Sequence, residues 1–394
     1  MLALAAGLGL LDSIRFVAVV ALSGLPGITM VAFLLKDRED IDQTSIHSLG
    51  IPLGLVISVG SQQILVAAGI GSFGWIVPAL CAFPFALRLS HGQSVHRSWR
   101  EGISRHVVLL VSAASLALAD VDWAFLIIGA ILAVLYFMPP RSFLVFLPLA
   151  VLSTRVAIAD YWYLISDDRL FEEAYSRAIF NFGFWDWYGT SSTWVPYHWF
   201  AHALGGVFQA TVTEESFVAV GTLPLLVAAM IFASSSWLII RSQVRIERLQ
   251  VASLLALPLL GIWFQGISNS ADLAIALGVW SLALWIVIAQ RPLSWLAVVV
   301  LSLALSSVML TKVSTGLVVL VGALIFITAT LCSSREQYTL DVRWFVPFAV
   351  TAIVFFANYD LLRFSNVDDS RSKIILFRSE EHTSELQSRQ YLVC

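Results

Sequence analysis

The feature that most constrains this chain is a succession of apolar runs, each close to the length that crosses a lipid bilayer. A helix needs about 20 mostly apolar residues to span the hydrocarbon core, and only helices and closed barrels satisfy every backbone polar group there. Such runs recur from residue 14 to residue 358 of the 394-residue sequence. The composition agrees, because 59% of the residues are hydrophobic and only 12% are charged, about half the charge of a typical soluble domain.

The sequence therefore predicts an all-α fold, a polytopic transmembrane helical bundle of about 12 spans. The expected spans are residues 14–35, 51–70, 73–87, 107–119, 123–138, 142–159, 216–240, 251–266, 273–289, 293–311, 314–332 and 344–358. Residues 73–87, 107–119 and 251–266 are shorter than a full crossing and are expected to be half-helices or members of tight hairpins. We expect a multi-pass protein of the cell (inner or plasma) membrane, in contact with membrane lipid.

Three parts are expected along the chain. Residues 1–140 form an N-terminal transmembrane extension, and residues 141–377 form a transmembrane core. Residues 378–394 begin with RSEEHTSELQS, which resembles the translation of a sequencing-adapter oligonucleotide. We therefore expect this tail to be non-native and the core to be truncated near Phe377.

One segment between the spans is polar. Residues 160–196 hold six acidic residues against two arginines, a net charge of about −4, and they are rich in Trp and Tyr. Such aromatic residues favour the membrane–water interface, and ionisable residues at a membrane are functional-site hypotheses by default. We interpret this acidic loop as the segment that carries the chemistry.

The distribution of Lys and Arg predicts the orientation. Residues 88–106 contain four arginines against one glutamate, and residues 241–248 contain three arginines against one glutamate. Cytoplasmic loops carry such an excess, so both segments are expected inside, as topology signals and not as sites for nucleic acid. Counting spans then places the acidic loop and residues 268–272 outside, and residues 335–343 inside.

After Ser166 the acidic loop has the periodicity of a helix. One face would carry Leu170, Phe171, Ala174, Tyr175, Ala178 and Ile179. Another face would carry Asp168, Glu172 and Ser176. We expect an amphipathic helix on the outer membrane surface, with the apolar stripe toward the membrane or the core and the second face toward an aqueous cavity. Glu173 and Arg177 have the i,i+4 spacing of a stabilising ion pair.

Asp167 and Asp168 stand where this helix is expected to start, and two roles are open for them. A short acidic side chain can cap a helix by accepting its first backbone N–H groups, and Asp167 is better placed to do so. A carboxylate at the membrane–water boundary can instead act as a general base toward an acceptor hydroxyl. Asp168 is the first candidate for this catalytic role, and Asp167 is the second.

His198 and His202 are four residues apart and share a helix face. The spacing suits a metal, but the H-E-x-x-H pattern is absent and the sequence fixes no third ligand. Two interfacial histidines that bind the acidic loop or a ligand are favoured over a zinc site. The metal ligands and the cofactor stay unknown, and a divalent cation is left open.

Two elements here resemble the first large external loop of GT-C-type membrane glycosyltransferases. They are SDDRLFEEAYSRAIFNFG from Ser166 and VPYHWFAHAL from Val195. In that superfamily an Asp early in the loop precedes a helix reading roughly F-x-x-x-x-A-R-S-I, and a Pro-Tyr-His element starts the next membrane helix. The matching residues are Asp168, Phe171, Arg177, Ala178 and Ile179, then Pro196, Tyr197 and His198. SNSADLAIALG from Ser268 resembles the external turn before a span, and LALSSVMLTKVSTGLVVL from Leu303 resembles a helical hairpin with a basic residue, Lys312, at its bend.

The resemblance implies an enzyme that transfers a sugar from a polyprenyl-phosphate carrier to an envelope acceptor on the extracytoplasmic face. Such a site needs a carboxylate, cations for the lipid phosphate and a groove for the isoprenoid. The residues expected to bind substrate are Glu172, Arg177, Tyr197, His198, His202 and Lys312. Two other classes stay open: a transporter or lipid flippase, which needs charges buried in its spans, and a non-catalytic envelope-assembly protein, in which Asp167 and Asp168 would be dispensable.

Overall fold

The structure is a computed structural model, and it describes residues 10–36, 41, 43–91, 167–183, 199–214, 218–243, 269–288, 293–333 and 342–359. This part of the chain is built from helices and contains no strand. The all-α prediction is therefore confirmed for the described residues. The expected spans 107–119, 123–138, 142–159 and 251–266 lie outside them, as does the tail 378–394.

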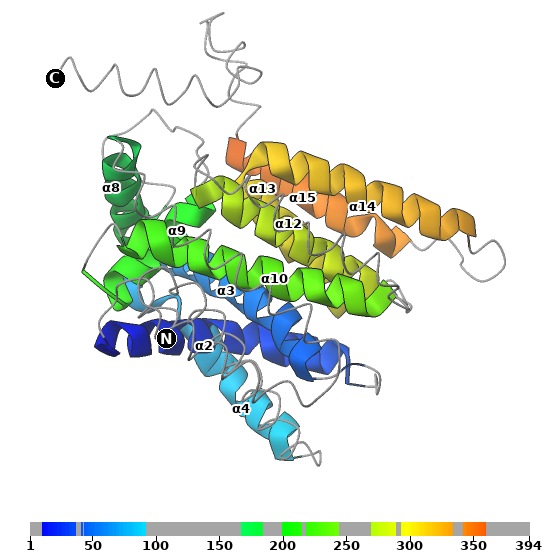
Figure 1. The fold of residues 1–394 in the computed structure, drawn as a ribbon, viewed down its shortest axis with the longest axis horizontal. Helices are drawn as coiled ribbons and strands as arrows, with labels where there is room; N and C mark the ends of the chain where they lie inside the picture. The colour runs from blue at the N-terminus through cyan, green and yellow to red at the C-terminus, as the bar shows by residue number, and fades with distance from the viewer. Residues whose placement is uncertain are drawn as a thin grey trace, which may run out of the picture.

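The described helices are mostly arranged side by side, with α8 standing across one end of the bundle and α4 diverging from it (Figure 1). The longer ones are α2 (Leu10–Leu34), α3 (Gln43–Ala67), α4 (Val77–His91), α8 (Asp167–Phe182), α9 (Trp199–Thr211), α10 (Leu223–Gln243), α12 (Asn269–Ile288), α13 (Trp295–Thr311), α14 (Val313–Ser333) and α15 (Val346–Tyr359). Three short helical segments connect them: η1 (Gly71–Phe73), the π-helix η2 (Val218–Thr222) and η4 (Val342–Trp344).

Four of the described helices are long and apolar enough to cross a membrane: Ile14–Leu34, Ser45–Ala67, Val218–Ser236 and Ser270–Ile288. Shorter apolar helices add Val77–Leu87, Trp295–Thr311, Val313–Ile325 and Val342–Ala357. All eight coincide with expected spans, so by length and composition the chain has the helices of a membrane protein. The number of about 12 spans stays a prediction.

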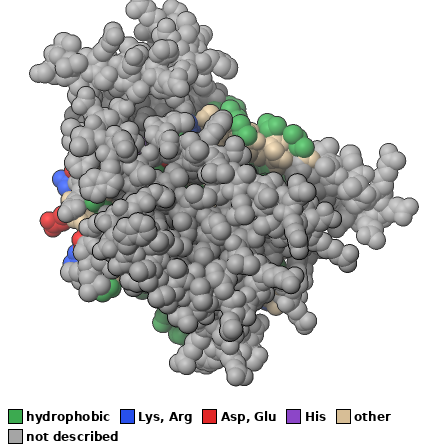
Figure 2. Space-filling model, viewed as in Figure 1, with side chains coloured by type: hydrophobic (Ala, Val, Ile, Leu, Met, Phe, Trp, Pro, Cys, Tyr) green, Lys and Arg blue, Asp and Glu red, His purple; other side chains and the backbone are tan. Residues whose placement is uncertain are grey.

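The outer surfaces of several helices are apolar. Large hydrophobic side chains of α14, namely Leu317, Val318, Val321 and Ile325, are exposed. In the space-filling view, hydrophobic side chains gather along the upper edge where α13 and α14 lie, while charged side chains gather at the left edge (Figure 2). Exposed apolar faces of this kind suit contact with lipid.

The hairpin of α2 and α3 is held by glycines. A Cβ added to Gly27 would overlap the backbone of both Gly50 and Gly54, and one added to Gly54 would overlap the carbonyl oxygen of Ser23. The two backbones are therefore in direct contact, which is how small residues pair membrane helices. The hydroxyl of Ser58 also donates a hydrogen bond to the Ser23 carbonyl over 3.3 Å.

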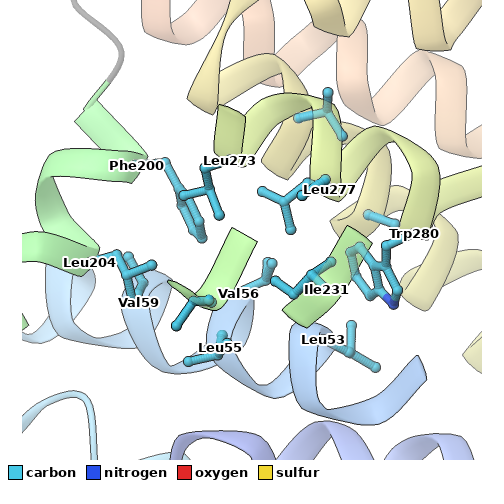
Figure 3. Close-up of a cluster of buried hydrophobic side chains, with 14 of the residues drawn as sticks. Leu53, Leu55, Val56, Val59, Phe200, Leu204, Ile231, Leu273, Leu277 and Trp280 are labelled. Atoms are coloured by element: carbon cyan, nitrogen blue, oxygen red, sulfur yellow. The ribbon is translucent and has the colours of Figure 1, made fainter. Parts of the chain in front are cut away.

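The opposite face of α3 packs into a core shared with the later helices. Figure 3 shows Leu53 of α3, Ile231 of α10, and Leu277 and Trp280 of α12 close together. The indole N–H of Trp280 donates to the carbonyl oxygen of Leu49 over 3.0 Å, which joins residues 231 positions apart in the sequence. The first helices and the later ones thus bury their apolar faces in one core.

Candidate functional site

One end of the bundle gathers the segments that the sequence places outside. Helix α8, the first residues of α10 and α12, and the bend between α13 and α14 all lie at the left in Figure 1. The end of α10 and η4, which adjoin segments expected in the cytoplasm, lie at the opposite end. This separation agrees with the alternation expected from the loop charges, whereas the side that each end faces stays a prediction.

The helix predicted after Ser166 is confirmed as α8, Asp167–Phe182. Ser166 and the side chains of Asp167, Asp168 and Glu172 lie outside the described part of the structure. The roles expected for these acids therefore stay predictions.

The face that α8 buries differs from the predicted one. Ser176 is 0% exposed, although it was expected to face an aqueous cavity, and Ala174 is exposed, although it was expected in the apolar stripe. The buried face consists of Tyr175, Ser176, Ile179 and Phe180. The prediction for Ser176 is wrong because α8 packs onto another helix through this face.

That helix is α9, which presents two adjacent glycines to α8. A Cβ added to Gly206 would overlap the carbonyl oxygen of Ser176, and one added to Gly205 would lie 3.3 Å from the Ser176 Oγ. The two glycines therefore allow the backbone of α9 to approach that of α8 at Ser176. Gly205 is equally close to the backbone of Val220 in η2, so α8, α9 and the π-helix meet around Ser176.

His202 lies in the same contact between α8 and α9. Its side chain is 3% exposed, and its ring packs edge-on against Tyr175 with 4.8 Å between the ring centroids. His202 does contact the acidic loop, as expected, but it is buried and not at the water interface. Its expected companions Tyr197 and His198 lie outside the described residues, and no group of three or more His, Cys, Asp or Glu within the described part could hold a metal.

The expected bend at Lys312 is confirmed. Lys312 is the single residue between α13 and α14, and its N–H donates to the carbonyl oxygen of Val308 over 2.9 Å. The bend is tight because Gly316 lies against the backbone of Met309, where an added Cβ would come within 2.7 Å of the Met309 Cα. Lys312 is partly buried.

The two cations expected to bind the lipid phosphate stand on separate parts of the fold. Arg177 is exposed on α8, whose main packing partners are α9, α3, η1 and η2, whereas Lys312 belongs to the α13–α14 hairpin. Helix α9 contacts both α8 and α13 and so links the two. The ion pair predicted between Glu173 and Arg177 is absent, since these two described side chains form no salt bridge with each other.

Sequence reasoning missed three buried polar residues near this end of the bundle. Asp272, in the first turn of α12, is 2% exposed, although it was counted only as part of an external turn. Gln62 and Gln63, in the last turns of α3, are 0% and 1% exposed. The signal was present in the sequence, because strongly polar residues within an apolar run are costly and need partners.

Comparison of the chain with models of known protein families, with curated proteins and with solved structures finds no match. The case for a function therefore depends on the chain's own residues and on the resemblance of its motifs.

Proposed function

We propose that this chain is an integral-membrane glycosyltransferase of the GT-C type, located in the cell membrane. It would transfer a sugar from a polyprenyl-phosphate carrier to an envelope acceptor on the extracytoplasmic face. One observation carries the proposal: the helix that begins with two adjacent acids, α8, is docked by its buried face on one end of an apolar bundle. Its first turn is the element that would meet both a lipid carrier and a soluble acceptor.

The chemistry needs few groups. As the acceptor hydroxyl attacks the anomeric carbon, the bond from that carbon to the phosphate oxygen breaks and the hydroxyl proton goes to a base. We assign the base to Asp168, with Asp167 as second candidate, and the phosphate contacts to Arg177 and Lys312. Glu172, Tyr197 and His198 complete the proposed substrate-binding set, whereas His202, buried against Tyr175, is left to support α8.

A transporter or flippase is the alternative from another class. It would require charged side chains buried in the middle of spans. The buried polar residues identified above stand elsewhere in the described helices: Asp272 is in the first turn of α12, and Gln62 and Gln63 are near the end of α3. No observation on the described residues therefore favours transport over transfer.

The direct test is sugar transfer from a polyprenyl-phosphate donor by the purified full-length protein in lipid. Product formation that requires the protein would support the proposal. A protein that moves the intact lipid-linked sugar across a vesicle membrane, without transferring the sugar, would replace it with the flippase alternative. Inactivity in both assays would favour an assembly role.

The proposed orientation has its own test. With the native cysteines replaced by Ala, we expect Arg177→Cys on α8 to react with an impermeant maleimide in intact cells. Lys36→Cys, which follows the opposite end of α2, should react only after lysis; both native side chains are exposed. The reverse pattern would place α8 inside and would contradict an extracytoplasmic site.

A further inference from the structure

The two buried glutamines of α3 are directed at the acid-bearing helix. Burying a primary amide is costly unless its donors and acceptor find partners, so the partners show what these side chains do. The Nε2 of Gln62 donates to the carbonyl oxygen of Phe180 over 3.4 Å. The Nε2 of Gln63 donates to the carbonyl oxygen of Ile179 over 3.5 Å.

Both acceptors belong to the end of α8. The last four carbonyl groups of a helix have no donor within the helix, and α8 ends at Phe182, so Ile179 and Phe180 are among them. The N–H of Gly183 supplies one donor, to Ile179 over 2.9 Å, with Gly183 in the left-handed conformation at φ 77°. Gln62 and Gln63 supply further donors from a helix more than 100 residues earlier in the sequence.

Gln62 also connects α8 to a third segment. Its Oε1 accepts a hydrogen bond from the backbone N–H of Trp75 over 2.9 Å. The neighbouring Ser61 hydroxyl donates to the carbonyl oxygen of Gly74 over 3.0 Å, a hydrogen bond that does not involve α8. One turn of α3 therefore holds the connection toward α4 through Ser61 and Gln62, and the end of α8 through Gln62 and Gln63.

These contacts determine how α8 is set on the bundle. The helix is fixed at its end by the glutamines and at its middle by the contact of Ser176 with Gly205 and Gly206. Ser176, Ile179 and Phe180 are three separate contact points on a rigid helix, and three points that do not lie on one line define both its direction and its rotation. Asp168 lies eight residues before Ser176, about 12 Å along the axis, so a small rotation at the fixed points redirects the acidic turn.

We propose that Gln62 and Gln63 are positioning residues that hold α8 in the rotation that presents its acidic first turn to substrate. The catalytic consequence rests on the proposed function, whereas the positional claim rests on the contacts above. Loss of both amide donors should loosen the end of α8 from α3 and expose the face that is now buried against α9.

The test measures this exposure without an activity assay. In the full-length protein with Cys81, Cys332 and Cys394 changed to Ala, Ser176→Cys reports the buried face and Arg177→Cys the exposed face. We expect Ser176→Cys to react with a maleimide far more slowly than Arg177→Cys. The Gln62→Met/Gln63→Met double variant keeps the size of the side chains but removes the amides. In that background the labelling rate of Ser176→Cys should rise about tenfold or more. The rate at Arg177→Cys should stay unchanged.

Matched controls keep the result interpretable. Ser61→Ala removes a bond from the same turn of α3 that does not reach α8, and it should leave the Ser176→Cys rate unchanged. If the double variant does not purify as a monodisperse protein, the single variants Gln62→Glu and Gln63→Glu remove one donor each, and each should raise the labelling rate of Ser176→Cys.

A labelling rate within twofold of the reference in the purified glutamine variants would overturn the proposal, whatever the transfer assay shows. An inactive protein with the expected labelling would reject the proposed function and leave the positioning role intact.

Discussion

The α2–α3 hairpin and the α8–α9 pair both bring two helix backbones into contact through glycine, yet they differ in how the contact is built. In the hairpin, Gly27 of one helix meets Gly50 and Gly54 of the other, so both partners lack side chains at the crossing. In the second pair, α9 supplies Gly205 and Gly206 while α8 supplies a serine.

The two pairs also differ in the length and polarity of their helices. Both helices of the hairpin are long and apolar enough to cross a membrane. Helix α8 is only 16 residues long, begins with acids and has an exposed face. It depends on side-chain hydrogen bonds from Gln62 and Gln63 as well as on packing. The hairpin is a scaffold whose position follows from hydrophobicity, whereas the position of α8 depends on a few specific contacts.

The largest effect should come from the acids of α8. Asp168→Asn keeps the size of the side chain but removes the base, and loss of general-base catalysis costs about 10²–10⁴ in rate. Asp167→Asn changes the neighbouring acid in the same way and is the matched control; it should keep most of the activity, because Asn caps a helix about as well as Asp. The measurement is sugar transfer from a polyprenyl-phosphate donor at matched protein levels. Equal rates for Asp168→Asn and the wild type would remove Asp168 from the catalytic role.

Next should come a stability effect at the scaffold crossing. Gly54→Ala places a methyl group against the Ser23 carbonyl oxygen, and such overpacking costs about 1–3 kcal/mol, at times more. Gly60→Ala, in the same helix but with no atom within 4 Å of the added Cβ, should be neutral or slightly stabilising. Thermal unfolding in detergent measures both. Equal unfolding midpoints for Gly54→Ala and Gly60→Ala would show that the α2–α3 hairpin tolerates separation of its two helix backbones.

At the contact between α8 and α9 we expect a smaller loss of thermal stability, together with a clear local increase in the exposure of α8. Gly206→Ala places a methyl group against the Ser176 carbonyl oxygen and should lift α8 from α9. We expect faster maleimide labelling of Ser176→Cys with a smaller loss of thermal stability than Gly54→Ala causes, because α8 lies at the end of the bundle. Gly322→Ala, which meets no atom within 4 Å, is the control. A loss of stability as large as that of Gly54→Ala would make α8 part of the scaffold.

The smallest effect should come from the surface ion pair of α2. Arg15 and Asp12 are 3.2 Å apart and partly exposed, and exposed pairs contribute about 0.2–1 kcal/mol. Arg15→Ala should therefore leave the unfolding midpoint nearly unchanged, and high salt should remove any difference that is measured. A drop comparable to that of Gly54→Ala would mean that charge, and not glycine packing, secures the hairpin.

Local patterns in the sequence predicted much of the fold. Runs of apolar residues identified the apolar helices that the structure describes, helical periodicity identified α8, and the motif around Lys312 identified the bend. Each of these depends on neighbours within a few turns of helix, because apolar length sets what a segment can span and local spacing sets its secondary structure.

The rotation of α8 and the partners of the buried polar groups were decided only by the tertiary structure. Periodicity showed that α8 has an apolar side, but Ser176 is buried because Gly205 and Gly206 leave room for its backbone. Gln62 contacts a carbonyl group 118 residues later in the sequence. The burial of a polar residue depends on which distant atoms complete its hydrogen bonds, and that information exists only once the helices have packed.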